Sequence, residues 1–304
     1  MPDLLHIATP EELARSKARS HAAGQRKYQT AIFYFAQKQL RVLKDTVNKH
    51  IVSTYPKSWV STGDILSFLL WSSIIEAQGC LNSSIADKPV IDEDARISVL
   101  SFPVQFRSTL HPPLPRGFLG AAFLMTSARV LHRDVCLTSR SQANSEFTMR
   151  DQGPKAEVET SLDSVDISAL ARVALAIRRS TQGIDDKAVR QVLAYLETHP
   201  EINPEAPLIL GSPRYYAGSS GASVVSWADQ CVYELDWGNV IGRCDAVRLS
   251  KMEYERDPIV LPRVPSLNGD DGGLEVIMSY EQGFMQRLIE CPVMRQFAVL
   301  RCLS

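Results

Sequence analysis

A long apolar run between Ile65 and Ala77 limits how this chain can fold. Its large side chains would fall on every side of a helix: Ile65, Leu66, Phe68, Leu69, Trp71 and Ile75. Three serines and Glu76 break the run, which falls short of the roughly 20 residues that a membrane span needs. A helix with so little polar face has to be covered by other elements. The run therefore predicts a buried helix inside a layered domain.

The residues that flank this run are typical of helix ends. Ser61 or Thr62 can cap the first turn, where Asp64 is also favoured, and Gly79 can stop the helix. We therefore expect a helix that begins after Ser61 or Thr62 and ends near Gly79.

Strand-like and helical patterns are interleaved along the rest of the chain. The predicted strands are residues 28–35, 97–106, 257–264 and 274–280. Helical spacing covers residues 40–51, 167–177, 189–196 and 281–289. Asp166 can cap the second of these helices, and the third ends before Pro200. Pro103 suits an edge strand or a bulge. Interleaving of this kind predicts an α/β domain.

Residues 225–238 (VSWADQCVYELDWG) combine a strand pattern with a glycine corner, and a turn precedes them. The Gly218–Gly221 run supplies the turn, and residues 231–236 alternate as in a half-buried strand. Gly238 follows Asp236 and Trp237, which predicts tight packing or a positive φ at the glycine.

Composition excludes several classes of function. The 304 residues suffice for one large domain or two modest ones, and 45% hydrophobic with 22% charged residues is typical of a globular protein. A net charge of −1 favours neither nucleic acid nor an acidic membrane as a partner. The N-terminus has no leader pattern, so we expect a soluble, cytoplasmic protein. The six cysteines have no CxxC spacing, so we expect reduced thiols and no metal site.

Several segments together resemble a known enzyme family. They are residues 61–71 (STGDILSFLLW), 112–120 (PPLPRGFLG), 226–227 (SW), 236–238 (DWG), 244–248 (CDAVR) and 271–276 (DGGLEV). They are similar to motifs of the BAHD acyl-CoA-dependent acyltransferases, in particular the fungal branch that includes the trichothecene acetyltransferases. The resemblance covers about residues 28–290 and is to the C-terminal half of a full-length member.

This resemblance implies a chloramphenicol-acetyltransferase-like α/β domain, with a mixed β-sheet and flanking helices. Residues 1–27 would be the crossover or connecting segment and residues 28–304 the C-terminal acyltransferase-like domain. Within that domain, the polar, charged and Ser-rich composition of residues 138–165 itself predicts a mobile polar loop. Acyl-CoA, for example acetyl-CoA, would be a co-substrate, with no tightly bound cofactor. The partners would be a small-molecule acceptor and an N-terminal half supplied separately.

The catalytic HxxxD motif of the family is absent from this sequence. None of the six histidines is followed four residues later by Asp. His132 is the nearest candidate, but Asp134 follows two residues too early and stands at the wrong place in the family order. An ordinary histidine at a helix end or on the surface is the favoured interpretation of His132, with a catalytic base as the alternative.

Ser226 and Trp227 are the predicted substrate-binding residues. In the family the equivalent Trp lines the acceptor pocket, although a core aromatic is the open alternative. Val225 stands where the family often has Thr, which favours a more apolar acceptor. Asp236, Trp237 and Gly238 would be a structural motif, with Asp236 bonding a basic partner.

Arg172, Arg178 and Arg179 could attract CoA phosphates, but a solvated helix face is the favoured interpretation of these arginines.

Three hypotheses of function stay open. The chain is part of an acyl-CoA-dependent O-acyltransferase that acetylates a fungal secondary metabolite, a non-catalytic CoA- or metabolite-binding remnant, or a misfolded pseudogene product.

Overall fold

The computed structural model describes residues 27–82, 96–115, 117–136, 166–199, 220–250, 256–264 and 272–304. Residues 1–26 and the predicted polar loop at 138–165 lie outside these ranges, so both expectations stay predictions. The first two residues of the predicted turn at 218–221 also lie outside them.

The described residues form mixed β-sheets, as predicted, but there are two sheets where a single one was expected. The larger sheet has the order β5 (Val225–Ser226), β6 (Arg256–Val260), β7 (Leu274–Glu281), β1 (Tyr28–Phe35) and β8 (Val299–Leu303). The smaller sheet has the order β3 (Phe123–Leu131), β2 (Ile97–Gln105) and β4 (Ser220–Ser223). Strands β5 and β6 are parallel, as are β2 and β4, and the remaining pairs are antiparallel.

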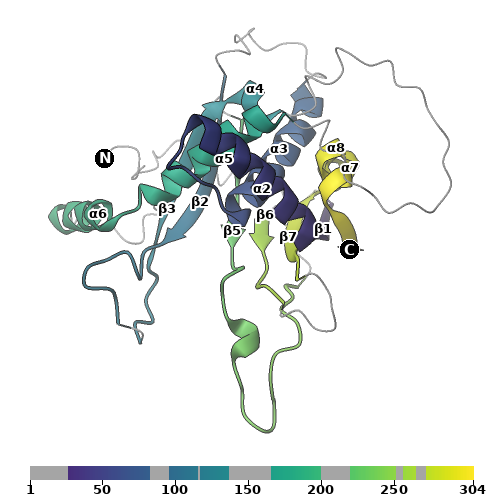
Figure 1. Cartoon of the computed structure of the whole chain (residues 1–304). Coiled ribbons are helices and arrows are strands. Elements are labelled where there is room, and N and C mark those ends of the chain that lie inside the picture. The colour runs from purple at the N-terminus through teal and green to yellow at the C-terminus, as the bar shows by residue number, and fades with distance from the viewer. Residues whose placement is uncertain are drawn as a thin grey trace, which may run out of the picture.

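Helix α3 (Thr62–Asn82) lies at the centre of the helical layer (Figure 1). It packs against α2 (Gln37–Thr54), α5 (Ile167–Gln182), α7 (Gln282–Glu290) and α8 (Pro292–Phe297). Trp71 is fully buried, and its indole Nε1–H donates to Ser98 Oγ of β2 at 3.0 Å. The predicted buried helix is therefore confirmed. The predicted stop at Gly79 is wrong, because the helix continues to Asn82.

The other predicted helices are also present. Asp166 caps α5 by accepting from the Ala169 backbone N–H at 3.0 Å, and Asp185 caps α6 (Asp186–Thr198) in the same way through Ala188 at 2.7 Å. Strands β3, β4, β5 and β8 and helices α4 (His132–Val135) and α8 have no counterpart among the predicted elements, and β4 begins inside the segment that was predicted as a turn.

The chain crosses from one sheet to the other at Val224. The Val224 N–H donates to Ser101 O of β2, and the Trp227 N–H donates to Val260 O of β6. Strand β4 pairs with β2 only as far as Ser101, so Pro103 has β3 as its one neighbour and lies at an edge, as predicted. The crossing places Ser226 and Trp227 at the junction of the two sheets.

Residues 227–250, which follow β5, project from the body of the protein (Figure 1, green). We call this segment the arm. Its only regular element among the described residues is a 3₁₀ turn at Val232–Glu234. The predicted strand at 231–236 is therefore wrong. Tyr233 is buried while Cys231, Glu234 and Leu235 are exposed, so no alternating face packs against the body.

The described helices include none with the length and hydropathy that would let it cross a membrane.

Candidate functional site

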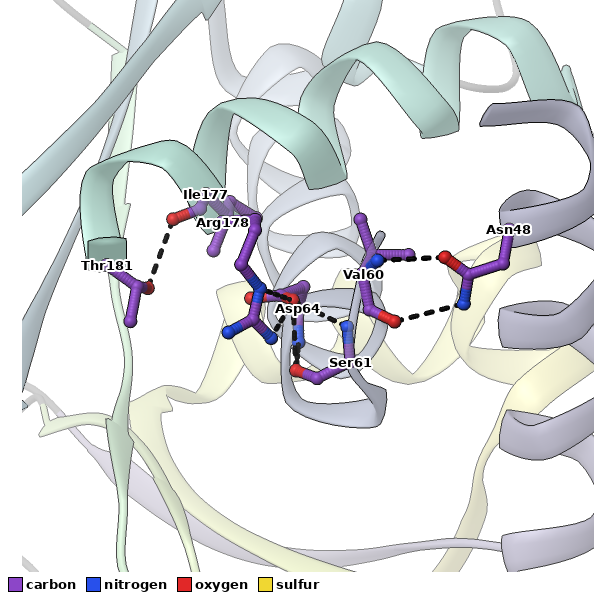
Figure 2. Close-up of polar contacts among 7 residues, drawn as sticks. All are labelled: Asn48, Val60, Ser61, Asp64, Ile177, Arg178 and Thr181. Carbon is purple, nitrogen blue, oxygen red and sulfur yellow. Dashed lines mark hydrogen bonds and ion pairs between the residues drawn. The ribbon is translucent and has the colours of Figure 1, made fainter. Parts of the chain in front are cut away.

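A buried ion pair joins the start of α3 to α5 (Figure 2). Ser61 and Asp64 form a reciprocal capping box. The Asp64 N–H donates to Ser61 Oγ at 3.2 Å, and the Ser61 N–H donates to Asp64 Oδ2 at 2.7 Å. The same Oδ2 accepts from Arg178 Nε at 2.8 Å and from Arg178 Nη2. One carboxylate therefore caps α3 and pairs with a cation of α5.

This pairing decides the role of Arg178. Its guanidinium also lies over the Trp59 ring, 4.2 Å from the ring centroid. The predicted solvated helix face is therefore wrong for Arg178. Its pairing with Asp64 also leaves it unable to meet a CoA phosphate. Arg172 pairs with Asp134 at 2.8 Å, and this hydrogen bond is the main cause of the raised pKa of Arg172. Arg179 lies over the Tyr55 ring.

The predicted substrate-binding residues lie side by side at the sheet junction. Ser226 is exposed on the short edge strand β5, and its Oγ accepts from the Ala228 N–H at 3.3 Å. Trp227 is half-buried and packs against a small apolar cluster of Ile259, Leu261 and Ile277. The cluster holds the indole in place while part of it stays accessible. This arrangement fits a pocket wall as well as a core aromatic, so both interpretations stay open.

The predicted structural motif forms the tip of the arm. Gly238 has φ +84°, and an added Cβ would meet no atom within 4 Å, so the positive φ, and not tight packing, requires the glycine. Asp236 Oδ1 accepts from the Gly238 N–H at 2.9 Å. Among the described residues, that carboxylate has a backbone partner and not the basic side chain that was predicted.

Two further backbone hydrogen bonds close the tip, where Asp236 and Arg243 face each other in an isolated antiparallel bridge. The Trp237 N–H donates to Gly242 O at 2.8 Å, and the Gly242 N–H donates to Gly238 O at 2.7 Å. The tip is therefore a tight, ordered turn.

The base of the arm is anchored to β7 by a buried carboxylate that sequence reasoning missed. Tyr233 Oη accepts from the Val247 N–H at 3.0 Å across the arm. Glu275 of β7 lies in a close ion pair with Arg248 at 2.8 Å, without hydrogen-bond geometry, and accepts from Arg301 of β8 at 2.8 Å. A Glu inside the otherwise apolar strand LEVIMSY was the available signal, because a buried carboxylate needs a partner.

The Pro-rich segment that resembles the family is held at both ends. Arg107 donates to Phe118 O at 2.6 Å and to Gly120 O at 2.7 Å. The His111–Pro112 peptide bond is cis. Asp186 of α6 accepts from the His111 N–H, and the hydrogen bond from Arg190 is the main cause of its lowered pKa. These contacts fix the path of the loop between β2 and β3.

His132 lies apart from the sheet junction. It begins α4, and its backbone N–H donates to Arg96 O, just before the start of β2. Strand β5 instead follows β4, whose pairing with β2 ends at Ser101, toward the other end of β2. His132 Nε2 lies 3.6 Å from Cys136 Sγ. Because the two predicted sites sit toward opposite ends of β2, the fold does not bring His132 to Ser226 and Trp227.

Other chemistry finds little support in the described residues. They contain no cluster of His, Cys, Asp and Glu that could hold a metal ion. Where the structure describes the side chain, the free thiols are Cys136, Cys231, Cys244, Cys291 and Cys302. Burial, aided by Glu76, raises the pKa of Cys291 to about 12, so its thiolate is too scarce at neutral pH for a nucleophile.

Comparison with known proteins places this geometry in context. No family model matches the chain. The O-acetyltransferase anaAT of Neosartorya fischeri is 25% identical over 86% of this chain and 48% of its own length. The O-acetyltransferase ptmV of Penicillium ochrochloron is 26% identical over 79% of this chain and 44% of its own length. The chain thus spans about half the length of the curated relatives it matches.

A solved structure shares the fold. TRI101 of F. sporotrichioides, complexed with coenzyme A and T-2, is 20% identical, with a TM-score of 0.61 over 91% of this chain and 52% of its own. Sequence similarity and fold together confirm the resemblance to the BAHD-type acyltransferases of fungi that the motifs predicted.

Proposed function

We propose that this chain is the C-terminal half of an acyl-CoA-dependent O-acyltransferase that acetylates a hydroxyl group of a fungal secondary metabolite. The observation that carries the proposal is the continuous similarity to O-acetyltransferases over most of this chain but about half of theirs. The TRI101 fold, in a structure that holds coenzyme A and T-2, supports CoA and a small acceptor as the two ligands.

The chemistry follows from the residues that are present and absent. A general base takes the proton of the acceptor hydroxyl, whose oxygen attacks the thioester carbonyl; the carbon–sulfur bond breaks and CoA leaves as the thiol. No histidine of this sequence has the HxxxD spacing, so the base comes from a second, N-terminal half. This chain supplies one wall of the site, where Ser226 and Trp227 contact the acceptor. The base itself contributes about 10²–10⁴-fold to the rate.

A chimaera tests this function. The region of anaAT that matches this chain is replaced by the chain itself, and release of CoA from acetyl-CoA is followed by mass spectrometry with a metabolite extract of the producing organism. We expect thiol release together with a new acetylated product. Trp227→Ala should weaken turnover by about tenfold, because it removes a pocket wall. Val52→Ala, on the exposed face of α2, is the matched control and should not.

The absence of HxxxD favours a second candidate, a binding protein without turnover. In that case the isolated chain shows a thermal shift with CoA, while the folded chimaera releases no thiol. The two functions are therefore separated by one pair of measurements.

A further inference from the structure

The turn between α2 and α3 presents aromatic and basic side chains to solvent. Tyr55 and Trp59 are 45% and 52% exposed, and Lys57 between them is exposed as well. Arg179 of α5 is exposed beside this turn, with its guanidinium 5.7 Å from the centroid of the Tyr55 ring. We call Tyr55, Lys57, Trp59 and Arg179 the aromatic–basic patch. Aromatic and Arg side chains are the types on which protein–protein interfaces depend most.

The fold holds this turn in one arrangement before any partner binds. At its start, the Tyr55 N–H donates to Ile51 O, and the Ser58 N–H donates to Tyr55 O. At its end, the side-chain amide of Asn48 accepts from the Val60 N–H at 2.8 Å and donates to Val60 O at 3.0 Å (Figure 2). A preorganised surface loses less conformational entropy on binding, which favours affinity.

Only positive charge surrounds the two rings. Residues 46–60 and helix α5 contain two lysines and three arginines but no Asp or Glu. Arg172 and Arg178 each pair with a carboxylate from outside these segments. Lys57 and Arg179 have no carboxylate partner among the residues that the structure describes. The patch is therefore complementary in charge to an acidic surface that carries apolar anchors.

We propose that the aromatic–basic patch docks an acidic acyl carrier protein, which delivers the acyl group on a pantetheine thiol in place of CoA. By this we mean a small helical protein whose docking helix is rich in Asp and Glu. The inference rests on the proposed function, in which the acyl donor is a thioester.

The spread of the patch favours a protein over a nucleotide. An arginine already lies over each ring, Arg178 over Trp59 and Arg179 over Tyr55. What stays exposed belongs to two separate rings with Lys57 between them. The phosphates of CoA call for the cations alone, whereas the side of an acidic helix with apolar anchors uses the rings and the cations together.

The transfer step is the same as with CoA. The acceptor oxygen attacks the thioester carbonyl, and its proton goes to the general base of the N-terminal half. The carbon–sulfur bond breaks, and the carrier leaves with a free pantetheine thiol. Opposite charges on the two surfaces steer the approach of the carrier, so its affinity should fall as salt rises.

Binding of a carrier domain tests the docking without any catalysis. The probe is the holo acyl carrier domain excised from a fungal polyketide synthase, and surface plasmon resonance measures its affinity for this chain, alone and in the anaAT chimaera. We expect Lys57→Glu with Arg179→Glu to weaken binding at least about tenfold, because attraction becomes repulsion. Tyr55→Ala should weaken it by about tenfold. Lys187→Glu and Leu193→Ala, the matched exposed changes on α6, should not. Thermal unfolding checks that each variant is folded.

Three results would overturn the proposal. The first is no binding of the carrier domain, and the second is binding that the paired charge reversal leaves unchanged. The third is a charge reversal that raises the KM for acetyl-CoA in the chimaera without weakening carrier binding, since the patch then holds the nucleotide of CoA. Carrier binding without acetyl transfer from either donor would refute the proposed function alone. Transfer from acetyl-CoA without carrier binding would refute the docking alone.

Discussion

Asp64 shows how a single residue serves two elements. Its carboxylate completes the capping box of α3 and neutralises Arg178 of α5, and both side chains are shielded from water. Asp64→Asn keeps the size of the side chain but leaves the Arg178 charge buried without a counter-ion. We expect a loss of about 3–5 kcal/mol in the free energy of unfolding, measured by urea denaturation.

A paired substitution separates charge from packing. Asp64→Leu with Arg178→Met removes both charges and should recover most of the free energy of unfolding that Asp64→Asn loses. The double variant still lacks the capping hydrogen bond, so we expect it to stay about 1 kcal/mol less stable than the parent. If Asp64→Asn alone costs less than about 1 kcal/mol, the ion pair does not hold α3 to α5.

Cys291 offers a second test at this scale. Because burial raises the pKa of its thiol to about 12, iodoacetamide at about pH 8 should modify Cys291 far more slowly than the exposed Cys231 and Cys302. Peptide mass spectrometry reads the rates, and denaturant should make them equal. Fast labelling of Cys291 in the folded protein would contradict the burial.

The same thiol gives a sign for the effect of pH. In the unfolded chain the thiol ionises near its usual pKa of about 8.5, while in the folded chain it stays protonated to about 12. The unfolded state therefore binds fewer protons in this window, and the contribution of Cys291 makes the protein less stable as pH rises through it.

At the scale of the element, two glycines with open space around them should respond in opposite ways to alanine. Gly238 has a positive φ in the arm tip, so Gly238→Ala should destabilise the tip by about 1–2 kcal/mol. Gly79 lies inside α3 without a positive φ, so Gly79→Ala should stabilise the protein by about 0.5–1 kcal/mol. Hydrogen exchange at the arm tip measures the effect of Gly238→Ala, and thermal unfolding measures that of Gly79→Ala. Equal effects of the two changes would contradict the difference in backbone conformation.

Elements with strong periodicity or clear caps were predictable from the sequence. Helix α5 follows its Asp166 cap, and β1 and β7 match the predicted strands. Strand β3 was missed because its side chains are largely half-buried without alternation, and it is defined by its nine-residue pairing with β2. Strand β8 is a short apolar run, VLRCL, yet it is exposed along its whole length, so it has no buried face that alternates with a polar one.

The same distinction holds for the site. Local chemistry predicted a cap at Ser61 or Thr62, Asp64 in the first turn of α3, and tight packing or a positive φ at Gly238. The partner of Asp64, Arg178, lies 114 residues away, and nothing in a single sequence links the two. Tyr233 misled the strand prediction, because a hydroxyl bond to the Val247 backbone, and not an alternating face, explains its burial.

At the scale of the whole molecule, Glu275 connects parts of the chain that are otherwise separate. It lies in the middle of the larger sheet, yet it contacts Arg248 at the base of the arm and Arg301 near the C-terminus. Arg301 in turn lies over the Tyr34 ring of β1, 3.8 Å from the centroid. The direction of the arm and the attachment of β8 therefore depend on one buried carboxylate.

Glu275→Gln should loosen both parts together. The amide leaves two arginines without a counter-charge, but each arginine is partly exposed and water offsets part of the loss, so we expect only about 1–2 kcal/mol. Hydrogen exchange should increase at Val247 in the arm and at Ser304 beside β1 in the same variant. Glu281→Gln, the same change at the exposed end of β7, should alter neither. Faster exchange at only one of the two places would mean that the arm and the C-terminal strand are anchored independently, and that the sheet, and not Glu275, sets the direction of the arm.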